Sequence, residues 1–169
     1  TELVEEHDEI IIGPGTTAFL VGRILTGIDD RRFRIITNSL ELAMEASAVT
    51  NIEAVVLGGE VHNRHSAGFA DREDFFSSCH HNHKAIISTD GIDVQRGLTL
   101  FDPRFLGVLR KTIAVSREII VAADSSKIGK VCFDRIADIS ALSMIVTDTG
   151  ASGKFCRAVE AMGVTVVKV

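Results

Sequence analysis

The sequence predicts an α/β fold built on an open, mostly parallel Rossmann-like sheet with helices on both faces. Three observations support this prediction. Short β-branched runs alternate with helical patterns, glycine turns directly follow several of those runs, and 46% of the 169 residues are apolar. A chain of this size buries one sizeable core, so we expect a single domain spanning residues 1–169.

Seven short apolar runs are the expected strands, because each is rich in β-branched residues and lies a helix length from the next. They cover Glu9 to Ile12, Phe33 to Thr37, Ala54 to Leu57, Ala85 to Ser88, Ile119 to Ala123, Ser143 to Thr147 and Val164 to Val169.

Four segments between these runs are the expected helices. Each has apolar residues three and four positions apart, and several begin with Ser or Asp, which cap helices well. They cover Thr16 to Leu25, Ser39 to Ala48, Pro103 to Val115 and Gly153 to Met162. Ligands of such sheets bind beyond the carboxyl ends of the strands, so the loops that follow strands are the places to search.

Composition narrows the function classes. The chain has 18 basic and 23 acidic side chains, a net charge of −5, and no basic run, so we do not expect it to bind nucleic acid by itself. It shows no signal peptide and no apolar run of membrane-spanning length. Three widely spaced cysteines without CxxC pairing indicate reduced thiols, and hence a cytoplasmic protein.

The clearest motif is Gly13-Pro14-Gly15-Thr16-Thr17, between the first expected strand and the first expected helix. Free backbone N–H groups and the positive end of a helix dipole attract a phosphate or a carboxylate, and two Thr hydroxyls add donors. The alternative is a plain turn at Gly15 with one Thr as helix cap.

Two further loops offer polar groups. Thr37-Asn38-Ser39-Leu40 follows the second strand, and its polar triplet either caps the next helix or turns the amide of Asn38 toward a ligand. Gly58-Gly59-Glu60 follows the third strand, where Glu60 either accepts bonds from ligand hydroxyls or belongs to an ordinary turn.

The loops after the fourth and fifth strands contain charged residues. Asp90-Gly91-Ile92-Asp93 and Gly97-Leu98-Thr99 place carboxylates on glycine turns, which suits sugar hydroxyls but is also a common turn sequence. The segment 123–129 contains Lys127, which either pairs with a phosphate or is simply solvated.

Taken together, these five loops resemble the C-terminal sensor domain of DeoR-type bacterial transcriptional regulators, in order and approximate spacing, from about residue 3 to about residue 149. The resemblance implies a fold similar to ribose-5-phosphate isomerase and glucosamine-6-phosphate deaminase. It also implies that a phosphorylated sugar binds and alters how an N-terminal helix-turn-helix domain grips its operator. We expect that DNA-binding domain to be absent from this chain, since no recognition helix with basic flanks precedes the first strand.

The resemblance assigns roles to the loop residues. Gly15, Thr16 and Thr17 would hold the phosphate, and Lys127 would form the far wall of the pocket. On the sugar side it implies Asp90, Gly91, Asp93 and Thr99, to which the loop chemistry adds Asn38, Gly59, Glu60, Gly97 and Arg104.

Two departures from the family pattern affect the expected chemistry. Many members have an Asp two residues before Gly-Thr-Thr, where this chain has Gly13 followed by Pro14. The segment after Thr99 is commonly rich in glutamate, whereas here it contains Asp102 and Arg104. Arg104 is either a contact to a phosphate or carboxylate or a solvated arginine.

Catalysis ranks below ligand sensing. An aldose–ketose isomerase needs a base close to the carbon-bound proton, and the related isomerases supply a glutamate from the segment where this chain has Asp102. Asp90 and Asp93 are the other candidate bases. We therefore expect that this protein is not an enzyme and that it uses no cofactor.

A separate His-rich segment, Cys79-His80-His81-Asn82-His83, offers four possible metal ligands, with His62 and His65 as the nearest candidates elsewhere. Adjacent ligands on one short segment rarely close a metal site. A polar surface loop is the favoured interpretation, and no metal residue is assigned.

Three hypotheses follow. The first is an effector-sensing domain of a regulator of carbohydrate metabolism, which is expected to be a repressor. Its partner would be a phosphorylated sugar, and the regulator would contact DNA only through the missing domain. The second is a sugar-phosphate isomerase or deaminase, and the third is an oligomerisation module with an inactive pocket. A homo-oligomer, dimer or tetramer, without membrane contact, fits the first and third, because operators have paired half-sites.

Overall fold

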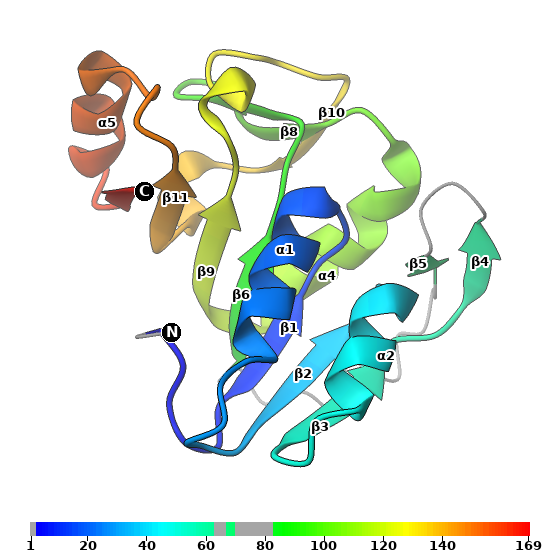
Figure 1. Cartoon of the computed structure of the whole chain (residues 1–169). Helices are drawn as coiled ribbons and strands as arrows, with labels where there is room; N and C mark the ends of the chain where they lie inside the picture. Colours follow the sequence, from blue (N-terminus) through cyan, green and yellow to red (C-terminus); the bar gives the residue numbers. More distant parts are fainter. Residues whose placement is uncertain (1–2, 63–66, 70–82) are drawn as a thin grey trace.

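The computed structural model describes residues 3–62, 67–69 and 83–169. Its centre is a seven-stranded parallel sheet, which runs through the middle of the molecule (Figure 1). The strand order is β12-β11-β9-β6-β1-β2-β3. The strands are β1 Glu9–Ile12, β2 Phe33–Thr37, β3 Ile52–Val56, β6 His83–Ile87, β9 Ser116–Ala122, β11 Met144–Thr147 and β12 Thr165–Lys168. The expected fold class and all seven expected strands are confirmed.

Strand boundaries differ from the expected ones where polar residues continue a ladder. β9 begins at Ser116 rather than Ile119, because its polar start pairs with β6, as in Lys84 opposite Glu118. β3 begins at Ile52 and lies beside β2 from Phe33 onward. Backbone pairing, which the apolar pattern does not report, therefore sets these ends.

The four expected helices are present; α1 has the expected bounds, and the other three are shorter at one or both ends. They are α1 Thr16–Leu25, α2 Leu40–Ser47, α4 Leu106–Val115 and α5 Gly153–Glu160. Ser39 and Ser152 cap α2 and α5 by accepting from Leu42 N and Phe155 N. Residues Pro103–Phe105 form a short 3₁₀ turn, η1, because the Asp102 side chain accepts from Arg104 N and turns the chain before α4 begins.

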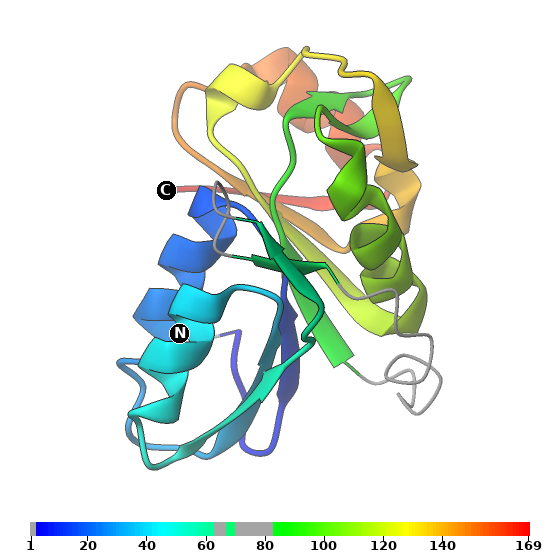
Figure 2. The same ribbon diagram turned by 90° about the vertical axis from the view of Figure 1, so that its right-hand side faces the viewer.

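Helices cover both faces of the sheet (Figure 2). On one face, α1 and α2 bury Leu25 and Leu42 in a cluster with Ile10 and Ile12 of β1. On the other face, α4 and α5 bury residues such as Leu109 against strand side chains that include Ile87, Val121 and Ile145. The near-continuous burial of β1 and β6 is what a parallel sheet covered on both sides requires.

Within the residues that the structure describes, five further short strands were not expected. β8 Gly97–Leu100 pairs with β7 Gly91–Asp93 and with β10 Asp134–Ala137, all antiparallel. β4 Glu60–His62 pairs with β5 Ala67–Phe69. Each has only three or four residues, several of them glycine or polar, so neither length nor alternation marks them in the sequence.

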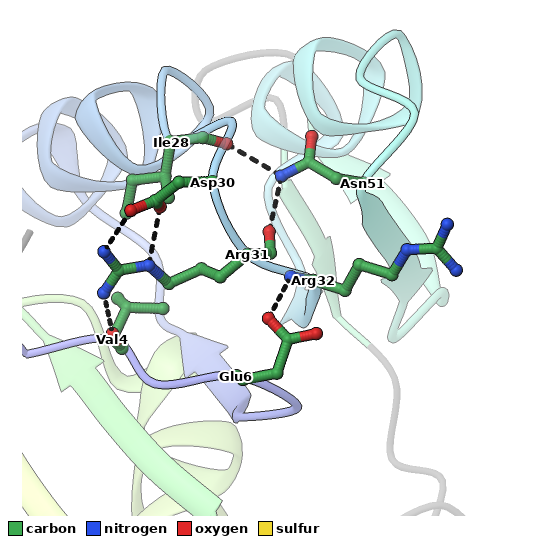
Figure 3. A network of polar contacts seen from close by, with 7 residues as sticks. All are labelled: Val4, Glu6, Ile28, Asp30, Arg31, Arg32 and Asn51. Carbon is green, nitrogen blue, oxygen red and sulfur yellow. Dashed lines mark hydrogen bonds and ion pairs between the residues drawn. The ribbon is translucent and has the colours of Figure 1, made fainter.

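The chain before β1 is fixed to the turn that follows α1 (Figure 3). Arg31 donates to Val4 O at 2.6 Å and to both carboxylate oxygens of Asp30 at 2.7 Å. Arg32 N donates to Glu6 Oε2 at 2.8 Å. Asn51 Nδ2 donates to the carbonyls of residues 28 and 31 at 2.8 and 2.7 Å, which holds this turn in place.

Among the described residues, no helix is both long and apolar enough to cross a membrane.

Candidate functional site

The sheet order creates a switch point between β1 and β6. The chain proceeds from β1 toward β3 on one side and from β6 toward β12 on the other, so the loops after these two neighbours diverge. Sheets of this kind bind ligands in the crevice beyond the carboxyl ends at such a point. Residues 13–15 follow β1, and residues 88–90 follow β6.

The loop after β1 is tied to the loop after β6. Gly13 N donates to Ile86 O at 2.9 Å, and Ser88 Oγ donates to Pro14 O at 2.8 Å. Gly15 has φ 110° and ψ 151°, a conformation open essentially to glycine alone, and a Cβ there would lie 2.2 Å from Ser88 Oγ. The backbone of residues 13–15 is therefore fixed where α1 begins.

No side chain caps the start of α1. Gly15 is its N-cap residue and supplies no side-chain cap, and the first turn holds no acidic residue. Phe19 N donates to Gly15 O at 2.9 Å, so helical bonding begins there and the preceding N–H groups have no partner within the helix. Thr16 is exposed at this position.

A cavity of about 1020 Å³ lies at this point, at the upper limit of ordinary ligand pockets. Four parts of the chain line it: the start of α1, the loop after β6, the first turn of α2, and the segment from β8 through η1 to α4. The lining residues are Pro14, Gly15, Thr16, Phe19, Ser39, Glu41, Ser88, Thr89, Asp90, Leu100, Phe101, Asp102, Pro103, Arg104, Phe105 and Leu109.

Four of the candidate binding residues named from the sequence line this cavity, namely Gly15, Thr16, Asp90 and Arg104, and so does the candidate base Asp102. The strand connections bring them together from two loops and one 3₁₀ turn. Asp90 is half-buried, and its Oδ2 accepts from Phe101 N at 2.9 Å. Arg104 forms an ion pair with Asp102, and this hydrogen-bonded partner raises the pKa of the guanidinium above its ordinary value.

The other candidates near β7 and β8 contribute to the packing of the small sheet. Gly91 leaves no room for a side chain, since a Cβ would lie 2.5 Å from Lys130 O, and Gly97 has φ +77°. Thr99 is buried, with its Oγ1 3.3 Å from Gly91 O and accepting from Cys132 N at 2.9 Å. Asp93 accepts from the N–H groups of Gln95 and Arg96, which closes the turn.

Thr17, Asn38 and Gly59 are not among the described residues that line the cavity. Thr17 follows Thr16 in α1 and is half-buried, and Asn38 is buried just before the cap of α2. Gly59, with φ 103°, precedes β4, whose first residue is Glu60; the side chain of Glu60 is outside the described part of the structure. Their roles toward a ligand stay predictions.

Lys127 ends η2, the short turn Ser125–Lys127 after β9. That turn is held by Asp148, whose carboxylate accepts from Ser125 N at 2.6 Å and from Gly150 N at 2.7 Å. The bond from Ser125 N is the main reason that the pKa of Asp148 is lowered. Lys127 thus lies at the carboxyl edge of the sheet, beyond the cavity lining, and its contact with a phosphate stays a prediction.

A comparison with known protein families shows which family this chain belongs to. The family model described as the DeoR C terminal sensor domain matches residues 1–149. The chain belongs to that family. The resemblance of the five loops is therefore confirmed, and the cavity lies at the switch point of a DeoR-type sensor domain.

Relatives of the sensor domain are named as transcriptional regulators. The chain is 29% identical over 162 residues to the HTH-type transcriptional repressor GlcR of Bacillus subtilis, covering 96% of this chain and 61% of that protein. It is 30% identical over 166 residues to the regulator YulB of the same species, covering 98% and 63%. The sensor domain thus spans less than two thirds of the length of these relatives.

Solved structures support the fold alone. The sensor domain is similar to eIF2B delta from Chaetomium thermophilum, with a TM-score of 0.58, 12% identity, and coverage of 85% of this chain and 50% of that one. Ribose 5-phosphate isomerase from Plasmodium falciparum gives a TM-score of 0.51, 20% identity, and coverage of 75% and 47%.

Sequence reasoning missed several residues of the cavity. Ser88 and Thr89 line it, and the hydroxyl of Thr89 donates to Thr99 O at 2.7 Å. The available signal was their position directly after an apolar strand, where polar side chains face a switch point. Phe19 and Phe101 had no such signal, because an aromatic residue in a helix or at a strand end is usually explained by packing.

The His-rich segment is mostly outside the described residues, which include only His83 of its five positions. The imidazole of His83 is buried in β6, with Nδ1 3.1 Å from Glu9 Oε2. In the part of the chain that the structure describes, no three His, Cys, Asp or Glu side chains are grouped so as to hold a metal ion.

Proposed function

We propose that this chain is the effector-binding part of a DeoR-type transcriptional repressor of carbohydrate metabolism, and that a phosphorylated sugar binds in the switch-point cavity. The single observation that supports this most is the start of α1. Its uncapped N–H groups line a cavity that also presents the carboxylate of Asp90, and the Gly15 conformation lets the backbone approach a ligand closely.

The two ends of such a ligand match different parts of the cavity. A phosphate suits the N-terminus of α1, where Thr16 adds a hydroxyl. Sugar hydroxyls donate to carboxylates, and Asp90 and Glu41 both line the cavity. DNA binding would belong to a part of the full regulator that this chain does not include, since the relatives are about one and a half times as long.

Binding rather than turnover fits the carboxylates of the cavity. Asp90 accepts from Phe101 N, and Asp102 accepts from the backbone N and the guanidinium of Arg104. These bonds hold both carboxylates in place within the chain, which suits the binding of ligand hydroxyls. The effector would then act by favouring one arrangement of the full regulator, to the extent that it binds that arrangement better.

A thermal-shift screen tests this proposal. Each phosphorylated sugar is run beside its unphosphorylated parent at equal concentration. A ligand at about 100 times Kd adds roughly 2.7 kcal/mol, which raises the Tm of a domain of this size by about 5–10 °C. A shift confined to phosphorylated compounds supports the proposal, and no shift with any of them contradicts it.

Thr16, the first residue of α1, and Thr26, its C-cap residue, provide a matched pair of variants. Thr16→Val removes the hydroxyl at the cavity end, and we expect severalfold weaker phosphate binding. Thr26→Val changes the other end of the helix, where Oγ1 donates to Arg23 O at 2.8 Å, and should leave binding unchanged.

Lys127→Ala, in the same assay, tests whether that lysine reaches the phosphate. NMR of the same mixtures detects any new species, which would favour the isomerase hypothesis instead.

A further inference from the structure

The segment that joins β8 to α4 gives the cavity its positive side chain. Arg104 is the one basic residue among the described residues that line it, and it lies on η1, apart from the start of α1. The cavity therefore has two separate features that attract anions, one made by backbone N–H groups and the other by a guanidinium.

The guanidinium of Arg104 is held in place before any ligand arrives. Asp102 Oδ1 accepts from Arg104 N at 3.1 Å and from Nε at 2.9 Å, and its Oδ2 pairs with Nη2 at 2.5 Å. Pro103 lies between the two residues, and its ring fixes its own backbone φ. The side chain of Arg104 is still 41% exposed, so a ligand can reach it.

A fixed guanidinium is suited to an oxyanion. Its planar set of N–H donors matches the two oxygens of a carboxylate or a phosphate, and its orientation by Asp102 reduces the entropy that binding costs. Resting on the proposed function, we propose that Arg104 binds a second oxyanion of the effector, so the preferred effector is a sugar bisphosphate or a phosphorylated sugar acid rather than a monophosphate of a neutral sugar.

The charge balance of the cavity makes this selectivity depend on Arg104. The other charged lining residues, Glu41, Asp90 and Asp102, are acidic and repel an oxyanion. Without the guanidinium, every charged side chain that the described residues contribute to the lining would be acidic. An exposed ion pair such as Arg104–Asp102 contributes little to folding, so the substitution tests binding without unfolding the chain.

The experiment is calorimetric titration at constant ionic strength with two ligand pairs. Fructose 6-phosphate is compared with fructose 1,6-bisphosphate, and glucose 6-phosphate with 6-phosphogluconate. We expect the doubly anionic member of at least one pair to bind about tenfold more tightly, as charge-assisted hydrogen bonds predict. The pair that shows the preference identifies the second group as a phosphate or a carboxylate.

Three variants assign the preference to Arg104. Arg104→Gln should abolish the ratio, chiefly by weakening the doubly anionic ligand, and Arg104→Lys should restore part of it by charge without the planar fork. Arg110→Gln is the control, because that arginine lies on α4 and donates to Arg135 O at 2.5 Å, outside the cavity lining.

The outcomes separate the two proposals. Monophosphate binding without any preference for the second anion, or a preference that survives in Arg104→Gln, overturns this inference and leaves the proposed function intact. Absence of binding for all four compounds, together with no shift for any phosphorylated sugar in the thermal screen, overturns the proposed function, and this inference with it.

Discussion

Gly15 is the residue on which the cavity end of α1 depends most directly. Its φ is positive, and a Cβ at this position would lie only 2.2 Å from Ser88 Oγ, which leaves no place for a side chain. We expect Gly15→Ala to cost about 1–3 kcal/mol of stability, from backbone strain and this clash, and to weaken sugar-phosphate binding at least tenfold. Chemical denaturation and calorimetry measure the two effects.

Ser88 provides the control for that prediction. Ser88→Ala alone removes one hydrogen bond, worth about 1 kcal/mol, but it also removes the atom that an alanine at position 15 would strike. In a double-mutant cycle, Gly15→Ala should therefore cost about 1 kcal/mol less in the Ser88→Ala background. Strict additivity of the two changes would show that the loops after β1 and β6 do not interact as described.

Asp148 gives the stability a defined pH dependence. Its pKa is lowered from 3.8 because the carboxylate accepts from Ser125 N and Gly150 N. A depressed folded-state pKa stabilises the fold fully above the unfolded value, and the gain is lost as pH falls through the folded value. We expect Asp148→Asn to lower Tm at pH 7, and the difference from the parent to shrink as pH falls below about 3.8. A difference that stays constant from pH 7 to pH 3 would contradict this account.

At the scale of elements, two helical glycines distinguish packing from propensity. A Cβ at Gly22 of α1 would lie 2.5 Å from Leu42 Cδ2 of α2, whose side chain is fully buried, whereas a Cβ at Gly107 of α4 meets nothing within 4 Å. Alanine favours helix by about 0.5–1 kcal/mol over glycine in both places, but overpacking costs about 1–3 kcal/mol.

Gly22→Ala should therefore destabilise the chain and Gly107→Ala should stabilise it, as unfolding in urea will show. If both substitutions changed the free energy of unfolding in the same direction, α1 and α2 could separate without cost. The close approach of the two helices would then not constrain the fold.

The segment before β1 is held to the element that follows α1. Val4 is buried with Leu25 and Ile28, and Arg31 binds its carbonyl. We expect Arg31→Ala to increase hydrogen exchange in residues 3–8 while leaving phosphate binding unchanged, because the cavity lies at the other end of α1.

Arg32→Ala is the matched control. Arg32 contacts the segment through its backbone, as donor to Glu6 and as acceptor from His7 N at 2.6 Å, and these bonds survive truncation of its side chain. Exchange that rises equally in both variants would show that the guanidinium of Arg31 does not hold the segment.

At the scale of the whole molecule, membership of a regulator family leads us to expect self-association. Operators with two half-sites match a protein with two-fold symmetry. Light scattering should therefore give a mass of at least twice 18.3 kDa, with or without a sugar phosphate. A mass of 18.3 kDa at all concentrations would place the dimer contacts outside this chain.

The sequence by itself determined the sheet strands, the helices and the loop that begins α1. These features depend on local patterns: buried β-branched runs, three- and four-residue apolar spacing, Ser caps at positions 39 and 152, and glycine before Thr16. The family also followed from the sequence, because five loops in order are more specific than any one of them.

Only the tertiary structure decided which loop residues meet. Asp90 and Arg104 line the cavity together with Gly15. Gly91 and Thr99 lie between Asp90 and Arg104 in the sequence, but they contribute to the packing of the small sheet instead. The bond from Ser88 to Pro14 spans 74 positions in the chain and depends on β1 and β6 being neighbours. Strand order is a long-range property, and no local spacing specifies it.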